Sequence, residues 1–237
     1  SQMNGGMLAK RIAASGAELI GIGISDAVGL PPTGDIGIPY ANYQGTPMGP
    51  DQTTFDDARR VLRDYDVTGR LPRRVVDYIN HGSPEKETPK AFPQNTYFLL
   101  NTLPDSCVYA KEIAREMGLN AVVLTSFLEG ESRDAGTVFA SIAREVQQYG
   151  QPFAPPCVIL SSGETTTKIL DNRQIRGHGG PSHELTAAFA LAAAKAPGAC
   201  MLSIDSEGTD GTTLAAGGIT DSCTMSAALE RGISLHD

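Results

Sequence analysis

The feature that most constrains the fold is the alternation of short, continuous apolar runs with amphipathic stretches. Because the runs are apolar throughout rather than at every second residue, they predict strands covered on both faces of a mostly parallel sheet. The stretches between them have helical periodicity, which favours βαβ crossovers. We predict an α/β fold: a mostly parallel sheet with helices on both faces, in a two-part architecture. The expected strands are 18–24, 96–100, 121–125, 157–160 and 200–204, and the expected helices are 56–65, 107–117, 135–149 and 185–195.

A length of 237 residues is enough for one large α/β domain or two small ones. The composition changes near Gln151–Pro156, so we predict parts at residues 1–150 and 151–237. Gly29–Gly49 and His81–Asn95 read as long loops. The chain begins without an initiator Met and stops just after a helix-like stretch, and we expect a fragment of a longer protein.

Composition excludes several classes of function. A net charge of −8 argues against nonspecific nucleic-acid binding, which needs a basic face. No apolar run reaches the 18 residues of a membrane span. The four cysteines are far apart and form no CxxC, which is typical of reduced thiols in a cytoplasmic protein. We therefore expect a cytoplasmic protein that binds neither nucleic acid nor membrane, and leave a small-molecule substrate and a homodimer open.

Several standard motifs are missing. The sequence contains no GxxxxGK[ST], no GxSxG and no HExxH. GxGxxG fails twice, because Asp26 follows Gly21-Ile22-Gly23 and Ser182 follows Gly177-His178-Gly179 at the third glycine position. These absences disfavour a P-loop kinase, a standard dinucleotide site, an α/β-hydrolase and a zinc protease.

Glycine-rich turns beside apolar runs are the remaining signal for an anion site. Ser161–Thr166 follows a buried run, and a Ser-Ser-Gly turn there aims N–H and hydroxyl groups at one point. Gly179 and Gly180 precede a helix that Pro181 opens, where orphan N–H groups and the helix dipole attract anions. A plain tight turn explains the first pattern equally well, and helix capping explains Glu184.

An acid-rich turn follows the last predicted strand. Asp205, Glu207 and Asp210 are three carboxylates within six residues, a set that can hold Mg²⁺ through oxygens and water or supply a base. A solvated Asp/Gly turn is the alternative. Ser25-Asp26 ends the first predicted strand, where a carboxylate is a candidate active-site group or a helix N-cap.

Seven short segments, in this order, resemble the glycerate 2-kinase family, which contains a MOFRL region and is also labelled hydroxypyruvate reductase. The resemblance spans nearly the whole chain. The segments are Ile24–Gly29 (the family's SDVxG), Gly45–Pro47 with Pro50–Phe55 (SGPT and PDPTTF), Glu87–Lys90 (ETPK), Leu128–Glu131 (LEGE), Ser162–Thr166 (GGETT), Gly179–Glu184 (GGRNQE) and Ser206–Gly211 (TDGxDG).

The resemblance implies ATP- and Mg²⁺-dependent phosphorylation of D-glycerate to 2-phosphoglycerate, in a crevice between two α/β domains. Residues 1–150 then correspond to the central part of the family's N-terminal region, and residues 151–237 to the MOFRL region. We assign catalysis to Asp26, Glu207 and Asp210, and metal binding to Asp205 and Asp210. The residues assigned to substrate and phosphate binding are Ser25, Ser162, Gly163, Glu164, Thr165, Gly179, Gly180, Ser182, His183 and Glu184.

The chain also departs from the family pattern. Pro181 stands where the family commonly has Arg, so Arg173 or Arg176 would have to supply a transition-state guanidinium. Glu207 replaces an Asp, and the family's N-terminal phosphate loop and C-terminal stretch are absent from the sequence. We therefore expect little kinase activity from these 237 residues alone. An NAD(P)H-dependent hydroxypyruvate or tartronate-semialdehyde reductase, and a non-catalytic ligand-binding relative, are the alternatives.

Overall fold

The computed structural model describes residues 5–33, 38–39, 49–65, 67–92, 95–169 and 178–235. The chain divides into two compact units. Unit 1 consists of residues 1–25 and 33–101, and unit 2 of residues 26–32 and 102–237. The contacts within the chain therefore place the main boundary between the two units near residue 101. The boundary at residue 150 that the family resemblance implies stays a prediction.

Unit 1 is built on a small sheet in the order β1-β3-β2. β1 (Leu19–Ile24) pairs in parallel with β3 (Asn95–Asn101), and β2 (Ile38–Pro39) adds to β3 in the antiparallel direction. A Cβ on Gly21 would lie 2.2 Å from the ring of Tyr97, and one on Gly23 would lie 2.4 Å from its hydroxyl oxygen. Gly21 and Gly23, the first two glycines of the incomplete GxGxxG pattern, thus leave space in β1 for the ring of Tyr97.

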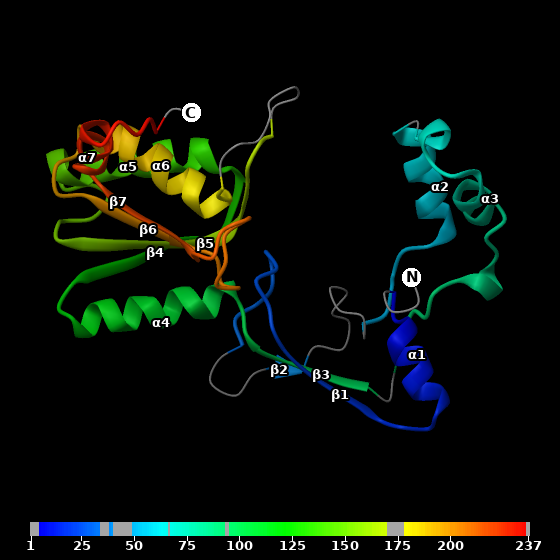
Figure 1. Cartoon of the computed structure of the whole chain (residues 1–237). Coiled ribbons are helices and arrows are strands. Elements are labelled where there is room, and N and C mark those ends of the chain that lie inside the picture. The colour runs from blue at the N-terminus through cyan, green and yellow to red at the C-terminus, as the bar shows by residue number, and fades with distance from the viewer. Residues whose placement is uncertain are drawn as a thin grey trace. The chain divides into compact units, whose positions relative to one another are not determined.

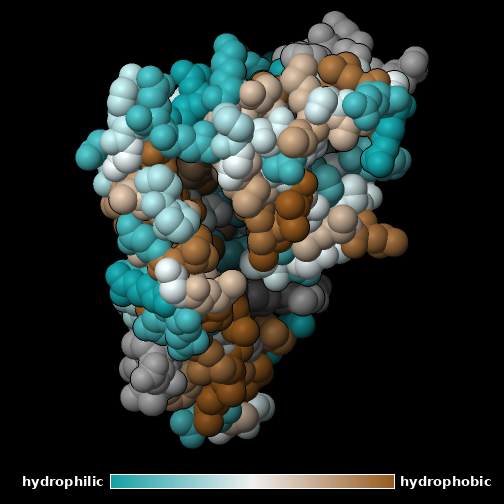
Figure 2. Space-filling view, turned by 90° about the vertical axis from the view of Figure 1, so that its left-hand side faces the viewer, coloured by the Kyte–Doolittle hydropathy of each residue, from teal (hydrophilic) through white to brown (hydrophobic). Residues whose placement is uncertain are grey.

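The opposite face of β1 is exposed, although we predicted that both faces of this strand would be covered. Ile20, Ile22 and Ile24 are 64%, 67% and 78% exposed, so this continuous apolar run is covered on one face only by the described residues. Figure 2 shows brown patches of hydrophobic residues on the face in view, between hydrophilic regions. No helix within the described ranges is both long and apolar enough to cross a membrane.

In unit 1, hydrogen bonds between polar side chains link two of the sequence motifs. The helices are α1 (Met7–Ala14), α2 (Phe55–Asp64) and α3 (Arg73–Asn80), with 3₁₀ turns at Thr68–Arg70 and Pro84–Lys86. Glu87 Oε1 accepts a hydrogen bond from the first N–H of α2, at Phe55 (2.8 Å). Lys90 Nζ donates to Glu87 and Thr88, and the Thr88 hydroxyl donates to Asp51. The ETPK and PDQTT segments therefore stabilise unit 1 by joining its loops.

Unit 2 is an α/β layer with helices on both faces, as predicted (Figure 1). β4 (Asn120–Glu131) and β5 (Cys157–Thr166) are parallel, whereas β6 (Cys200–Ile204) and β7 (Gly217–Asp221) form an antiparallel pair. α4 (Leu103–Glu116) covers one face. α5 (Ser132–Tyr149), α6 (Pro181–Ala193) and α7 (Thr224–Glu230) cover the other.

The structure of unit 2 differs from the prediction mainly in where its strands begin and end. The prediction that Ser161–Thr166 forms a turn is wrong, because β5 continues to Thr166 and pairs with β4 as far as Glu131. The pairing continues because Gly163 allows a close approach: a Cβ there would lie 2.0 Å from the Leu128 carbonyl oxygen. Strand β7, which the sequence analysis did not predict, begins at Gly217.

The core of unit 2 lies between α5 and α6, which pack against each other. Ala140 packs with Phe189 and Ala193, all at most 2% exposed. Gly136 lies beside α6, where a Cβ would meet the Leu185 carbonyl oxygen at 2.3 Å. Early residues of α5 thus meet early residues of α6, so the helices run in the same direction. Both N-termini therefore lie at the end of the sheet where β4 and β5 finish.

This packing makes Gly136 a test of the fold. We expect Gly136→Ala to lower the free energy of unfolding by about 1–3 kcal/mol, since overpacking against a backbone carbonyl outweighs the better helix propensity of alanine. Urea unfolding followed by circular dichroism measures the change. Gly69→Ala is the control, because nothing lies within 4 Å of a Cβ at that position. Equal unfolding midpoints for the two variants would contradict the close α5–α6 contact.

Candidate functional site

Carboxylates gather in unit 2 around the end of β5. Glu164 is paired in register with Glu129 of β4, near the end of the parallel ladder. Partial burial, together with the negative charges of Asp26, Asp205 and Glu207, raises the pKa of Glu164. Asp26, Asp205 and Glu207 thus act electrostatically on Glu164, whose side chain is exposed, and the assignment of these carboxylates to a catalytic region stays a prediction. Such mutual repulsion favours a cation or a proton nearby.

The turn after β6 is closed by hydrogen bonds of its own. Asp205 Oδ1 accepts from the Glu207 N–H (2.8 Å), and the Asp205 N–H donates to the Ala216 carbonyl (2.6 Å). Asp205 is partly buried and Glu207 is exposed. Within the described residues, no three His, Cys, Asp or Glu side chains converge closely enough to hold a metal ion. A cation here would need further ligands from a substrate or water.

Asp210 has a different environment from the other carboxylates. Its side chain is 1% exposed and faces the N-terminus of α6. Oδ1 accepts from the Ser182 N–H (3.2 Å), and Oδ2 accepts from the His183 N–H (2.7 Å) and from Nδ1 of His183. The carboxylate thus satisfies orphan N–H groups of a helix whose N-cap, Gly180, has no side chain of its own.

The glycines of this region are required by that contact. A Cβ on Gly180 would lie 2.3 Å from Asp210 Oδ1. Gly211 has φ +58°, and a Cβ there would lie 1.9 Å from the Gly179 carbonyl oxygen. The glycine turn before α6 and the acid-rich turn after β6 are therefore packed directly on each other. Close approach of a ligand is a second use for Gly179 and Gly180, and it stays a prediction.

A cavity of about 630 Å³ lies along α5 and α6, and it extends from the N-terminal end of α6 to Ala192 near its C-terminal end. Arg133, His178, His183 and Glu184 line its polar part, and Ala187 and Leu191 belong to its apolar part. Arg133 Nε lies 3.4 Å from Glu184 Oε1, while Glu184 Oε2 is buried without a hydrogen-bond partner among the described residues. A guanidinium, two imidazoles and a helix N-terminus together suit an anionic ligand.

Two predicted phosphate-binding hydroxyls have structural partners instead of facing this cavity. Ser162 Oγ donates to the Leu103 carbonyl (3.1 Å) and accepts from Cys107 Sγ, which joins β5 to α4. Thr165 Oγ1 accepts from the buried Ser132 hydroxyl (2.9 Å), which joins β5 to the start of α5. These contacts give both hydroxyls a structural role that needs no ligand. A role of Ser162 and Thr165 in phosphate binding stays a prediction.

The remaining predicted residues fall in several places. Ser25 is buried in unit 1, where its N–H donates to the Asn101 carbonyl, and Asp26 is an exposed residue of unit 2. The Ser203 hydroxyl donates to that of Ser182 (3.0 Å). Arg173 and Arg176, the arginines expected to replace the one lost at Pro181, lie outside the described residues.

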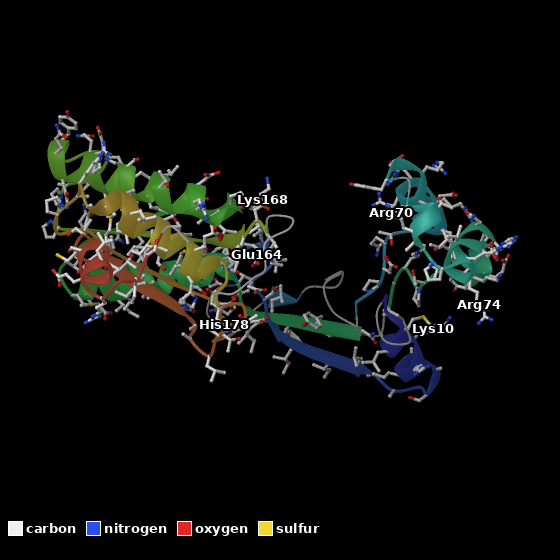
Figure 3. The ribbon with its side chains drawn as sticks, turned by 45° about the horizontal axis from the view of Figure 1, so that its top comes forward. Lys10, Arg70, Arg74, Glu164, Lys168 and His178 are labelled. Atoms are coloured by element: carbon white, nitrogen blue, oxygen red, sulfur yellow. The ribbon has the colours of Figure 1, made fainter. Side chains whose placement is uncertain are left out.

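Arg133 was not predicted from the sequence. It lies two residues after the end of β4, in the first turn of α5 and beside the start of α6. Its position after a strand that ends in Leu-Glu-Gly-Glu was a usable signal, because ligands of α/β proteins bind at the carboxyl ends of strands. Figure 3 shows Glu164, Lys168 and His178 at the same end of unit 2. The cavity and the carboxylates thus share one end of the sheet.

Comparison with known proteins accounts for both parts of the chain. Residues 157–237 match the MOFRL family model, and residues 1–80 match DUF4147, a domain of unknown function. A Pyrococcus horikoshii protein named glycerate 2-kinase is 36% identical over 245 residues, which cover 100% of this chain and 51% of that protein. A Thermotoga maritima protein named D-glycerate 2-kinase is 32% identical over 225 residues, or 94% of this chain and 49% of that protein.

A solved structure and a relative of another name complete the comparison. The crystal structure of Thermotoga maritima glycerate kinase has a TM-score of 0.72 at 31% identity, and the match covers all of this chain and 52% of that one. An Agrobacterium vitis protein with the provisional name of a hydroxypyruvate reductase is 32% identical over 244 residues, or 100% of this chain and 52% of its own length. The chain spans about half the length of these relatives. It belongs to the MOFRL-containing family that includes proteins named glycerate 2-kinase.

Proposed function

We propose that the protein containing this chain transfers a phosphoryl group from ATP to the 2-hydroxyl of a small hydroxy acid, D-glycerate. The observation that carries the proposal is the cavity at the N-terminus of α6, where Arg133, His178 and His183 meet a helix end fixed by Asp210. Phosphoryl transfer depends mainly on positioning and on stabilising the charge of the phosphates. This end of unit 2 offers groups suited to that task.

The anion half of the proposed site is the cavity. Arg133 is a candidate for the guanidinium that Pro181 cannot provide, since it lies in the polar part of the cavity and its side chain is 73% exposed. A guanidinium binds phosphate or carboxylate through a planar pair of donors. We assign Gly179 and Gly180, which line the cavity, to the same anion, because the Ser182 and His183 N–H groups at the start of α6 already donate to Asp210.

The cation half is the group of carboxylates. The like charges around Glu164 are what a bound Mg²⁺ would relieve, and Mg²⁺ usually takes one or two carboxylates together with substrate phosphates. Because no three such side chains of the described residues converge on one point, we assign Mg²⁺ to Asp205 and Glu164 with its other ligands from phosphate oxygens and water, and an orienting role to Asp26. Asp210 is left out of this group because both of its oxygens accept hydrogen bonds in a buried place. Mg²⁺ would neutralise charge on the phosphates during transfer.

The reductase alternative is favoured by the name of the Agrobacterium vitis relative. The structure offers it little support, because Gly21 and Gly23 lie inside β1 against Tyr97 and not in a turn that opens a helix. A non-catalytic relative would bind Mg-ADP and glycerate without turnover.

The assay that decides between these functions uses the full-length gene product. We expect ADP release that requires both D-glycerate and Mg-ATP, because the proposed site holds groups for phosphates and for a cation. Oxidation of NADH by hydroxypyruvate at 340 nm, with no need for ATP, would overturn the kinase proposal in favour of the reductase. Calorimetric binding of Mg-ADP and glycerate with no turnover would leave a binding protein.

Arg133→Met tests the anion half. We expect it to weaken binding of Mg-ADP about 10- to 100-fold, which corresponds to the loss of a charge-assisted hydrogen bond. Titration calorimetry measures the affinity. Arg144→Met is the matched control, since Arg144 is an exposed arginine of the same helix that does not line the cavity. The same affinity in both variants would place the anion elsewhere.

Glu164→Gln tests the carboxylate group. Because the pKa of Glu164 is raised above its ordinary value of 4.5, the folded state binds the proton more tightly than the unfolded state. This stabilisation is present below pH 4.5 and is lost as the pH rises through the folded value. We therefore expect a higher urea midpoint for Glu164→Gln than for wild type at pH 7, and equal midpoints near pH 4.

Glu112→Gln, an exposed residue of α4, is the control for this comparison. We also expect Mg²⁺ to raise the urea midpoint of the wild type more than that of Glu164→Gln, because the cation neutralises the clustered charge. A midpoint that responds to Mg²⁺ equally in both proteins would argue against a cation among these carboxylates.

A further inference from the structure

One histidine of the cavity is fixed at a single ring nitrogen. Asp210 Oδ2 accepts hydrogen bonds from the backbone N–H of His183 and from its Nδ1. The side chain of Asp210 is 1% exposed, whereas that of His183 is 32% exposed. One buried oxygen therefore holds both the helix backbone and the imidazole, and the ring has little freedom to turn.

This contact determines the tautomer of the ring. An ionised carboxylate only accepts hydrogen bonds, so Nδ1 of His183 must carry the hydrogen. In a neutral imidazole the other nitrogen, Nε2, then has a free lone pair and accepts a hydrogen bond. Among the described residues, none is hydrogen-bonded to Nε2 of His183. His183 also lines the cavity, so an acceptor on this ring is available to a ligand there.

The charged and titratable neighbours of His183 come from each side of the cavity. Arg133 comes from α5, Glu184 from α6 and His178 from the segment that precedes α6. Asp210 comes from the turn after β6. Arg133 is paired with Glu184, and Nδ1 of His178 lies 3.2 Å from the Thr212 hydroxyl. Of the two imidazoles in the cavity, His183 is the one that a buried carboxylate orients.

We propose that Nε2 of His183 accepts the hydroxyl proton of the substrate during phosphoryl transfer, and that Asp210 is the residue that positions it. This inference rests on the proposed function. The hydroxyl O–H bond breaks and its proton moves to Nε2, while the oxygen lone pair forms a bond to the terminal phosphorus of ATP. The bond from that phosphorus to ADP breaks, and its electrons stay on ADP. The resulting imidazolium is stabilised by the adjacent Asp210 carboxylate.

The role is specific to the residue present in this chain. His183 stands where the GGRNQE pattern has Gln, and an amide side chain can form a hydrogen bond but cannot take up a proton. A purely structural role for the contact is the alternative, in which Asp210 serves only to cap α6. The tautomer is the same in both roles, which differ in whether a ligand covers Nε2 of His183 and in the step of turnover that a variant affects.

The first measurement does not depend on activity. In long-range ¹H–¹⁵N spectra of the ¹⁵N-histidine-labelled 237-residue chain, the signal lost in His183→Asn identifies His183. We expect the neutral ring in the Nδ1–H form in wild type, and a shift toward the Nε2–H form in Asp210→Asn. We also expect D-glycerate with Mg-ADP to slow acylation of His183 by diethyl pyrocarbonate. An Nε2–H ring in wild type, or acylation that the ligands do not slow, would overturn the proposal.

The second measurement is turnover by the full-length gene product. We expect His183→Asn to lower kcat by about 10²- to 10⁴-fold with little change in KM, as for loss of a proton acceptor. Asp210→Asn should lower kcat in the same way. His81→Asn, an exposed histidine of unit 1, is the control with wild-type activity.

The outcomes distinguish a failure of the role of His183 from a failure of the proposed function. ADP release by wild type together with a kcat within twofold in His183→Asn overturns the role of His183 alone. A failure of the wild type to release ADP from Mg-ATP and D-glycerate overturns the proposed function, and the proton transfer falls with it. Because the tautomer is measured on wild-type protein, the proposal can fail even where the Asp210→Asn chain does not fold.

Discussion

The burial of one carboxylate, Asp210, organises the candidate site. A buried charge is tolerated only where hydrogen bonds replace those lost from water, and here the N-terminus of α6 and the ring of His183 supply them. The same bonds satisfy N–H groups that a helix capped by glycine would leave unpaired. The helix end, the turn after β6 and the imidazole are therefore fixed by one interaction, and removing it affects all three.

The glycines on each side of this contact follow from it. Gly180 and Gly211 bring two turns together so closely that neither position has room for a Cβ. Gly136 does the same for the contact between α5 and α6, so the two helix N-termini lie beside each other. Arg133 and Glu184 meet at 3.4 Å because of this packing. Backbone approach, rather than turn flexibility, is thus the main use of glycine in this part of the chain.

Much of the architecture was predictable from local patterns. Strand β6 begins and ends at the predicted residues, and the start of β5 was also correct, although Leu202 and Ile204 of β6 are exposed and the prediction of strands covered on both faces fails there. The continuation of β5 through Ser161–Thr166 was not predictable, since it depends on Gly163 meeting Leu128 from a distant strand. The partners of the Ser162 hydroxyl lie 55 and 59 residues away in sequence, so no local rule reveals that it joins β5 to α4.

The electrostatics of the site have two opposite parts at one end of unit 2. Partial desolvation and the neighbouring carboxylates raise the pKa of Glu164, and these carboxylates repel an anion, whereas the guanidinium of Arg133 attracts one. A bare phosphate satisfies only the second part, and a bare cation only the first. A phosphate with bound Mg²⁺ would satisfy both parts, because its negative oxygens suit Arg133 and its cation suits the carboxylates. This complementarity is the physical basis on which we propose a metal–nucleotide complex, rather than either ion alone, as the ligand of this end of unit 2.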